Sequence, residues 1–347
     1  MSRVYLDYNA TAPLRPEARA AMMGAMELVG NPSSVHSEGR AAKALMERAR
    51  GQVATALGAD GADVIFTSGA TEAAALACAG RALKVAGIEH DAVRAWAEEC
   101  LEVDRDGRVT VTAPERSALQ AANSETGVIQ DLPEGLAVSD MTQAFGKLPV
   151  AFNWVGCEMA LVSAHKLGGP KGVGALIVRR GTDIAARIRG GGQEMGRRSG
   201  TENLIGIAGF GAAAEAAARD LEEGVGARIE KLRNILEKAL EDSVKETIFV
   251  GKSVRRLPNT TCFITPGWKG ETQVMALDLA GFAVSAGSAC SSGKTQASHV
   301  LQSMGYDATE AGCALRVSLG PETTEDEIER FAENWAKLHQ RHRARAA

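Results

Sequence analysis

Lys166 has the residue type and the position to react with an aldehyde. It ends the segment Ser163-Ala-His165-Lys166, which follows an apolar run and precedes a glycine-rich loop. Partial burial at a strand end lowers the pKa of an ammonium group, and a neutral amine attacks aldehydes. The pattern therefore indicates a Schiff-base site that holds an anionic cofactor. The alternative is a surface lysine at the end of a strand, and this segment alone does not exclude it.

A second segment has the composition of a phosphate-binding turn. Ser68-Gly-Ala70-Thr71 follows the strand-like residues 63–67 and begins an alanine-rich stretch that runs from residue 72 to 85. The free N–H groups and the positive dipole end of a helix N-terminus attract phosphate, and a glycine lets the backbone approach it closely. Many strand-to-helix turns have this composition, so the prediction depends on its combination with Lys166.

Two further residues suit an aromatic cofactor. Asp140 follows the short apolar stretch Leu136-Ala-Val138, where its carboxylate could keep a pyridinium nitrogen protonated. His90 could stack on the cofactor ring or move protons. The alternatives are a turn or cap aspartate and a structural histidine.

Cys290 and Arg316 have the surroundings expected of reactive or ligand-binding groups. Cys290 lies among small polar residues and close in sequence to Lys294, and exposure with nearby positive charge favours the reactive thiolate. Arg316 interrupts an apolar strand pattern. A partly buried arginine needs an anion, so its partner is either a substrate carboxylate or an internal carboxylate.

The elements that must position these residues alternate between helix and strand, which favours an α/β fold. The sequence predicts a helix that begins at Pro16, a strand over 63–67, and a long helix over 212–244 that glycines at 224 and 226 break or kink. Thr324 and Glu327 form a capping-box pattern before a terminal helix. We expect residues 341–345 to be a frayed, solvated tail.

Composition narrows the class of protein. The chain has 347 residues, 45% of them hydrophobic and 24% charged, which is typical of a globular protein. A net charge of −4 argues against a general nucleic-acid-binding protein. We find no signal-peptide pattern, no apolar run long enough for a membrane span, and six scattered cysteines without metal-ligand spacing. We therefore expect a cytoplasmic protein that binds no metal.

These segments together resemble the NifS-like and IscS-like cysteine desulfurases, within the class V aminotransferase superfamily. The resemblance spans most of the chain and rests on these ordered matches: Tyr5-Leu-Asp-Tyr-Asn-Ala-Thr11, Gly30-Asn-Pro-Ser-Ser-Val-His36, Phe66-Thr-Ser-Gly-Ala-Thr-Glu72, Glu89-His90, Ser163-Ala-His-Lys166, Arg198-Ser-Gly-Thr201, Ser288-Ala-Cys290 and Arg316-Val-Ser-Leu-Gly320.

The resemblance implies the fold type I of enzymes that use pyridoxal 5′-phosphate (PLP). A large mixed-sheet domain would span residues 13–220. A smaller α+β domain, formed by residues 1–12 and 221–347, would carry the loop with the reactive cysteine. The family also implies a homodimer.

The resemblance further assigns roles to individual residues. Lys166 would bind PLP covalently and move protons, and Cys290 would take the substrate sulfur. His90, Asp140, Gln143 and Ser124 would contact the cofactor ring or its substituents. The phosphate would be held by Ala70, Thr71, Ser163 and His165, with Thr201 reaching in from the partner subunit. Arg316, together with Ser124, would bind the carboxylate of L-cysteine.

The implied activity is conversion of L-cysteine to L-alanine, with the sulfur kept as a persulfide on Cys290. A sulfur-acceptor or iron–sulfur scaffold protein, or a tRNA thiolation enzyme, would receive it, and no direct contact with nucleic acid or membrane is expected. The alternatives are a selenocysteine lyase, another PLP-dependent β-lyase, and a non-catalytic sulfur-transfer scaffold.

Two departures from the family pattern stand out. The chain between Gly69 and Lys166 is shorter than expected, with material missing from residues 108–122 and 130–137, so the large domain is predicted to be trimmed on one flank. Ser124 stands where the family usually has an asparagine. Because serine is shorter and offers one donor, cofactor tuning or substrate affinity is expected to differ.

Overall fold

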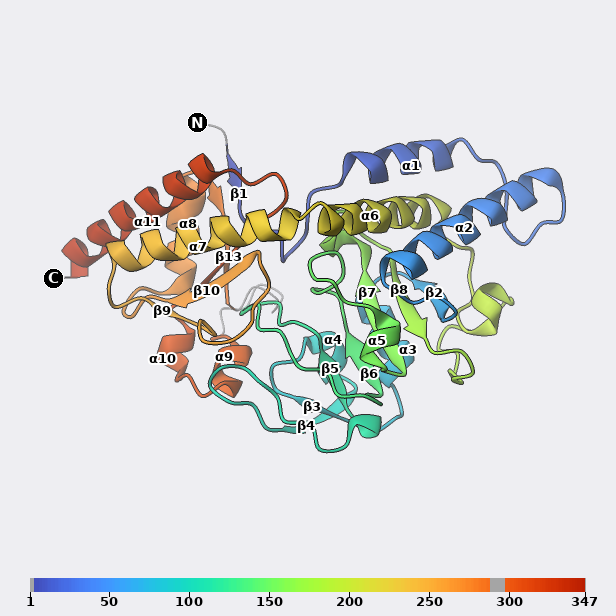
Figure 1. Ribbon diagram of the computed structural model, residues 1–347, viewed down its shortest axis with the longest axis horizontal. Coiled ribbons are helices and arrows are strands. Elements are labelled where there is room, and N and C mark those ends of the chain that lie inside the picture. The colour runs from blue at the N-terminus through green and yellow to red at the C-terminus, as the bar shows by residue number, and fades with distance from the viewer. Residues whose placement is uncertain (1–2, 288–296, 347) are drawn as a thin grey trace.

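The computed structural model describes residues 3–287 and 297–346, and a five-stranded mixed sheet lies at the centre of its first half (Figure 1). Its strands, in spatial order, are β2 (Asp63–Thr67), β8 (Gly174–Val178), β7 (Met159–Ser163), β6 (Val138–Asp140) and β5 (Ala118–Gln120). β5, β6 and β7 are parallel, whereas β8 is antiparallel to both β7 and β2. The parallel strands therefore bring their carboxyl ends to one edge.

Both faces of this sheet are buried. Ala160 and Val162 of β7 belong to one apolar core, and Met159 and Leu161 belong to another, as the twofold periodicity of a strand requires. The first core is completed by α2 (Ser37–Ala56) and α6 (Leu204–Glu222), and α1 (Pro16–Met26) packs on α6. The second core is completed by α3 (Ala70–Cys78). Helices thus cover the sheet on both sides and leave its edge for the site.

The second half of the chain builds a smaller α+β unit. A four-stranded antiparallel sheet has the order β12 (Ser285–Ala286), β13 (Ala314–Ser318), β10 (Thr260–Ile264) and β9 (Ile248–Phe249). Its core includes residues of α7 (Val225–Ser243), α8 (Gly270–Leu279) and α11 (Glu325–Ala346). The N-terminal strand β1 (Val4–Tyr5) pairs with β11 (Phe282–Ala283), so the two ends of the chain meet in this unit (Figure 1).

The architecture confirms the predicted α/β class, with a large mixed sheet and a smaller α+β part. The proposed boundaries at residues 12 and 220 stay a prediction. In the described residues, no helix is both long and apolar enough to cross a bilayer.

Short elements lie between the two units. β3 (Leu83–Ala86) and β4 (Ala97–Leu101) form a separate pair, which a single bridge between Lys84 and Ser117 joins to the start of β5. α4 (Asp91–Arg94) connects the two strands, while α9 (His299–Ser303) and α10 (Ala308–Ala311) precede β13. Of the two stretches where we expected missing material, residues 108–122 contain β5 and the 3₁₀ turn Pro114–Arg116, and residues 130–137, which the structure describes in full, contain no helix or strand.

Several predicted elements agree with the structure. The helix at Pro16, the strand over 63–67 and the reciprocal Thr324–Glu327 cap are all present. The long helix expected over 212–244 is two helices, and Gly224 (φ 75°) separates them, as the glycines predicted.

The alanine-rich stretch over 72–85 is helical only to Cys78, because Ala79 is extended and Gly80 has a positive φ of 79°, and strand β3 follows at Leu83. One prediction was wrong. The tail is not frayed, since α11 continues to Ala346. There His342 stacks on Trp268, and Arg343 donates to Glu246 at 2.8 Å.

Candidate active site

A cavity of about 610 Å³ opens where the strands of the large sheet end. Residues that end or follow β2, β5, β6 and β7 line it, together with the segment that follows β1 and one residue of β13. Ten of the predicted site residues line this one cavity: Ala70, Thr71, His90, Ser124, Asp140, Gln143, Ser163, His165, Lys166 and Arg316.

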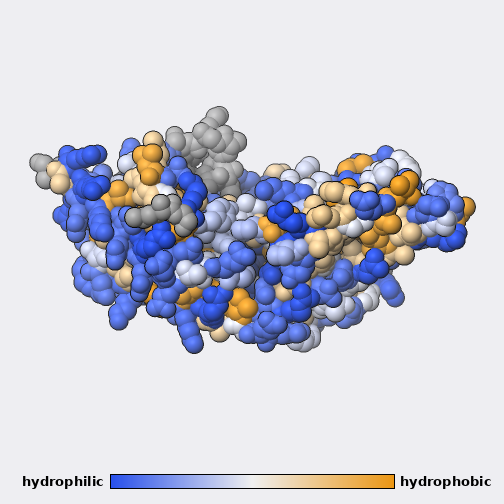
Figure 2. Space-filling view, turned by 90° about the horizontal axis from the view of Figure 1, so that it is seen from above, coloured by the Kyte–Doolittle hydropathy of each residue, from blue (hydrophilic) through white to orange (hydrophobic). Residues whose placement is uncertain are grey.

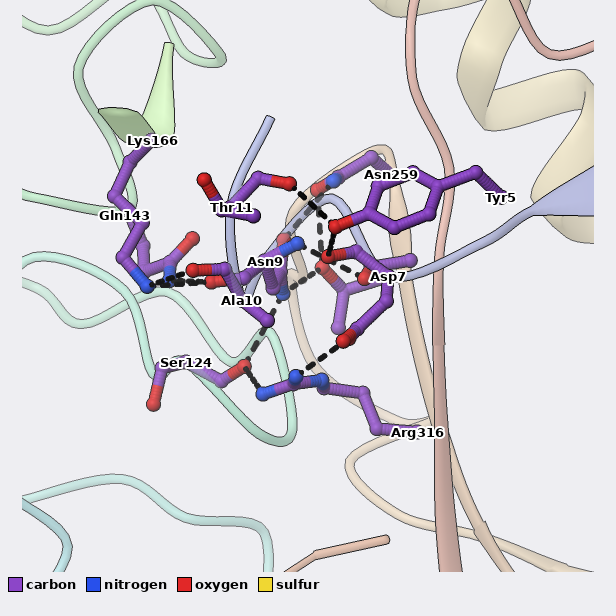
Figure 3. A network of polar contacts seen from close by, with 12 residues as sticks. Tyr5, Asp7, Asn9, Ala10, Thr11, Ser124, Gln143, Lys166, Asn259 and Arg316 are labelled. Atoms are coloured by element: carbon purple, nitrogen blue, oxygen red, sulfur yellow. Dashed lines mark hydrogen bonds and ion pairs between the residues drawn. The ribbon is translucent and has the colours of Figure 1, made fainter. Parts of the chain in front are cut away.

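Lys166 lies in a 3₁₀ turn directly after β7. Its Nζ donates to the carbonyl oxygens of Asn9 at 2.7 Å and of Ala10 at 2.9 Å (Figure 3). The N-terminal segment therefore holds the amine at the cavity wall, within reach of a ligand.

The turn at Ser68 lines the cavity where α3 begins. α3 begins at Ala70, so the positive end of its dipole points at this region. Gly174 of β8 allows the turn to approach closely, because a Cβ there would lie 2.8 Å from the Gly69 backbone.

His165 also lines the cavity, and its Nδ1 lies 3.2 Å from Thr11 Oγ1. Burial, reinforced by the charges of Lys166, Lys171 and Lys147, lowers the pKa of His165 to about 4. Its imidazole is therefore neutral near pH 7. A neutral ring offers one N–H donor and one acceptor.

The loop that contains Arg198 and Thr201 packs against the start of α3. Glu72 accepts from the backbone N–H of Ser68 at 2.7 Å and from Arg198 Nε at 2.8 Å. Burial acts to raise the pKa of Glu72, but these bonds outweigh it, so the pKa is lowered. Thr201 itself is exposed and lines a smaller neighbouring cavity. Within one chain, the structure therefore does not bring Thr201 to the cavity of Lys166.

Asp140 is the last residue of β6 and lines the cavity. Its Oδ1 accepts from the Thr142 backbone N–H at 2.9 Å, which fixes the carboxylate at the strand end. His90 caps α4 and accepts from the Ala92 backbone N–H at Nδ1, 3.1 Å away. In the neutral ring the proton is therefore on Nε2.

Arg316 enters the cavity from β13 and is 2% exposed. One terminal nitrogen binds Asp7 Oδ1 at 2.8 Å, and the other donates to the Ser124 carbonyl at 3.1 Å (Figure 3). Its Nε is buried and has no partner in the structure. Of the two partners that the sequence left open, the internal carboxylate Asp7 is therefore present.

Cys290 lies outside the described residues, as do Ser288, Ala289 and Lys294. Gly287 is the last described residue before this gap, and Ser298 is the second one after it. Both lie next to Glu125. Ser298 Oγ donates to Glu125 Oε2 at 2.5 Å, and burial is the main cause that raises the pKa of Glu125 to about 7. Gly287 and Ser298 thus lie next to the residue that follows Ser124 in the sequence, and Ser124 lines the cavity.

Sequence reasoning missed three residues that organise this site. Asn9 is 1% exposed and contacts both Lys166 and the Ser124 carbonyl. Lys147 donates to Gln143 Oε1 at 2.5 Å, and Glu125 binds Ser298. The four-residue spacing of Gln143 and Lys147 was one available signal, and Asn9 lies in the matched segment Tyr5–Thr11, although no role was assigned to it.

The family model "Aminotransferase class-V" matches residues 4–331. A cysteine desulfurase from Cereibacter sphaeroides is 39% identical, over 96% of this chain and 95% of its own length. The cysteine desulfurase IscS of Dictyoglomus turgidum is 36% identical, over 94% and 91% of the two chains. This chain belongs to the cysteine desulfurases, within the class-V aminotransferases.

Experimental structures of cysteine desulfurase relatives agree with this placement. A NifS-like protein from Rickettsia africae superposes with a TM-score of 0.88 at 33% identity, over 97% of this chain and 99% of its own. SspA, whose structure was determined in complex with cysteine, superposes with a TM-score of 0.76 at 25% identity, over 92% and 100% of the chains. The expected family and fold are confirmed, whereas the roles of the individual site residues stay predictions.

Proposed function

We propose that this desulfurase uses PLP to convert L-cysteine to L-alanine and keeps the sulfur on Cys290 for transfer. The observation that carries the proposal is one cavity that joins an amine, an anion-binding turn, a strand-end carboxylate and a buried guanidinium. These four groups match the aldehyde, phosphate and ring nitrogen of PLP and the carboxylate of an amino acid.

The residues present fit PLP. Lys166 supplies the amine for its aldehyde, and Asp140 supplies a carboxylate for its ring nitrogen. Gln143 would contact the ring hydroxyl and His90 the ring face, and both line the cavity. Ala70, Thr71, Ser163 and the neutral His165 surround the phosphate position, to which we propose that Thr201 of the partner subunit also contributes. When bound, PLP withdraws electrons from the carbon atoms of the amino acid.

We propose that Arg316 binds the carboxylate of L-cysteine. Its position supports this role, because Arg316 is a buried guanidinium in the wall of the cavity, and a guanidinium is a strong partner for a carboxylate. Asp7 and the Ser124 carbonyl hold the guanidinium in place.

In the proposed sulfur transfer, the Cys290 thiolate attacks the sulfur of L-cysteine. The new S–S bond forms as the C–S bond breaks, and the electron pair of that bond stays with the carbon fragment. Lys166 would then move a proton to that carbon, which gives L-alanine. The enzyme keeps Cys290 as a persulfide, and a later thiol of an acceptor protein or iron–sulfur scaffold takes the outer sulfur.

We also propose a homodimer. Thr201 lies away from its own cavity, and large apolar side chains near α1 are exposed, among them Met23 (62%), Val29 (84%) and Val35 (88%). Figure 2 shows apolar side chains gathered on the face that α1 occupies. Exposed apolar patches of this kind are typical of interfaces. The cytoplasmic location that we expect from the sequence stays a prediction.

Three measurements test the proposed function. The purified protein should absorb at roughly 400–430 nm, as a lysine-bound PLP does, and Lys166→Ala should lack this band. Wild type should release alanine and sulfide in equal amounts from L-cysteine, whereas β-elimination would yield pyruvate. Cys290→Ala should lose sulfur transfer. Full sulfide and alanine release by that variant would exclude the persulfide, and a wild type without the absorption band would favour the scaffold alternative.

A further inference from the structure

We propose that Lys147 is a positioning residue that fixes which end of the Gln143 amide faces the cofactor. The inference rests on the proposed function, because it gives the neighbour of Gln143 a task in PLP binding. Lys147 does not line the 610 Å³ cavity that holds Asp140, Gln143 and Arg316, so its side chain acts behind the proposed cofactor position and not in it.

The geometry places Lys147 directly behind Gln143. Its Nζ lies 2.5 Å from Gln143 Oε1 and 3.0 Å from Asn9 Oδ1. Gln143 is 4% exposed, and its Nε2 donates to the Asn9 carbonyl at 3.0 Å. Hydrogen bonds therefore join each pair among Lys147, Gln143 and Asn9. Gln143 and Asn9 line the cavity, and Lys147 lies behind them.

The chemistry of the amide group gives these hydrogen bonds a direction. A glutamine amide presents an oxygen acceptor at one end and an N–H donor at the other, and rotation by 180° exchanges them at little steric cost. Lys147 donates to Oε1, so the amide nitrogen lies on the side of the Asn9 carbonyl, and both Asn9 and Gln143 line the cavity. An N–H donor is what an anionic ring oxygen of PLP requires, and the flipped amide would oppose two oxygens.

Burial, together with the nearby charges of Lys166 and Arg316, lowers the pKa of Lys147 well below its usual range. The positioning role holds in both protonation states, because even a neutral amine has two hydrogens for its two oxygen partners.

Lys147 lines a second cavity, of about 510 Å³, which Lys166 also lines and Gln143 does not. This cavity leaves room for a longer side chain at residue 147, which provides a conservative variant. Arginine, like lysine, only donates hydrogen bonds. Glutamine at this position would offer an oxygen as well as a nitrogen and would allow either amide orientation, and methionine would offer no donor.

The test is the affinity of the cofactor-depleted enzyme for added PLP. The holoenzyme of wild type, Lys147→Met, Lys147→Gln and Lys147→Arg is stripped of PLP and titrated with PLP, with Lys231→Met, an exposed lysine of α7, as control. A hydrogen bond to a charged group is worth about 1.5–3 kcal/mol, so we expect the Met and Gln variants to bind PLP about tenfold or more weakly. The Arg and control variants should stay within about threefold of wild type.

A double-mutant cycle shows whether Lys147 acts through Gln143. In a Gln143→Ala background, Lys147→Met should change PLP affinity by less than about threefold. Equal PLP affinity of Lys147→Met and wild type overturns the proposal, and so do effects that add fully in the double variant. If Lys147→Met fails to fold, the comparison of the Gln and Arg variants decides. A wild type that binds no PLP would instead overturn the proposed function, and this inference with it.

Discussion

Glu125 makes the stability of the enzyme depend on pH in a way that the structure allows us to calculate. Its carboxyl is 4% exposed, accepts from Ser298 and has its pKa raised to about 7, chiefly by burial. An acid whose pKa is higher in the folded than in the unfolded state contributes its stability fully below the unfolded pKa. That contribution is lost as the pH rises toward the folded pKa.

The magnitude follows from the two pKa values. The unfolded carboxyl has its ordinary value of 4.5, and the folded one titrates at about 7. At about 1.4 kcal/mol per pH unit, this difference amounts to about 3 kcal/mol lost between pH 4.5 and pH 8. Glu125→Gln keeps the shape of the side chain and removes its titration, so the variant should gain about 3 kcal/mol relative to wild type over that range.

The assay is urea unfolding of wild type and Glu125→Gln at several pH values from 4.5 to 8, with identical PLP loading. Titration of every other group cancels in the difference between the two proteins. The difference in unfolding free energy should rise with pH and level off above about pH 7.5. Parallel pH profiles would refute the reasoning, since they would mean that Glu125 titrates alike in the folded and unfolded chains.

Three further predictions follow from the site and its supports. Arg316→Lys loses the planar fork that binds carboxylates, so the KM for L-cysteine should rise about tenfold or more with unchanged PLP content, and an unchanged KM would exclude Arg316 as the carboxylate ligand. His165 should stay neutral down to about pH 5 in an NMR titration, because its pKa is lowered to about 4; protonation near pH 6.5 would contradict its burial. Gly320→Ala would place a Cβ 1.9 Å from the Tyr8 ring, so it should cost about 1–3 kcal/mol in thermal unfolding, and less in a Tyr8→Ala background.

The parts of the site that sequence analysis predicted are local. Each predicted group lies at the end of a strand: Asp140 ends β6, while Lys166 and the Ser68 turn follow β7 and β2 within a few residues. Parallel strands bring such ends to one edge of the sheet. Lys147 escaped prediction because its role depends on Asn9, which is 138 residues away in the sequence. No periodicity or spacing records a contact over that separation.

The fold shows the same division. The break at Gly224 was predictable because a glycine there adopts φ 75° without a side-chain penalty. The change from helix to strand after Cys78 was not predicted, since alanine is a strong helix former, although Gly80 ends the helix with φ 79°. Strand β3 then places Leu83, 1% exposed, in the core, so tertiary burial overrides the local helix propensity.

Asn9 explains why the cavity of the large sheet depends on strands of the smaller unit. Its backbone N–H donates to Ser318 of β13, and its side chain donates to Thr260 of β10, while its carbonyl accepts from Lys166 and Gln143. A shift of either strand therefore moves the oxygen that holds the reactive amine. The lysine can be recognised from its own neighbours in the sequence, but its position is set by residues of the second half of the fold.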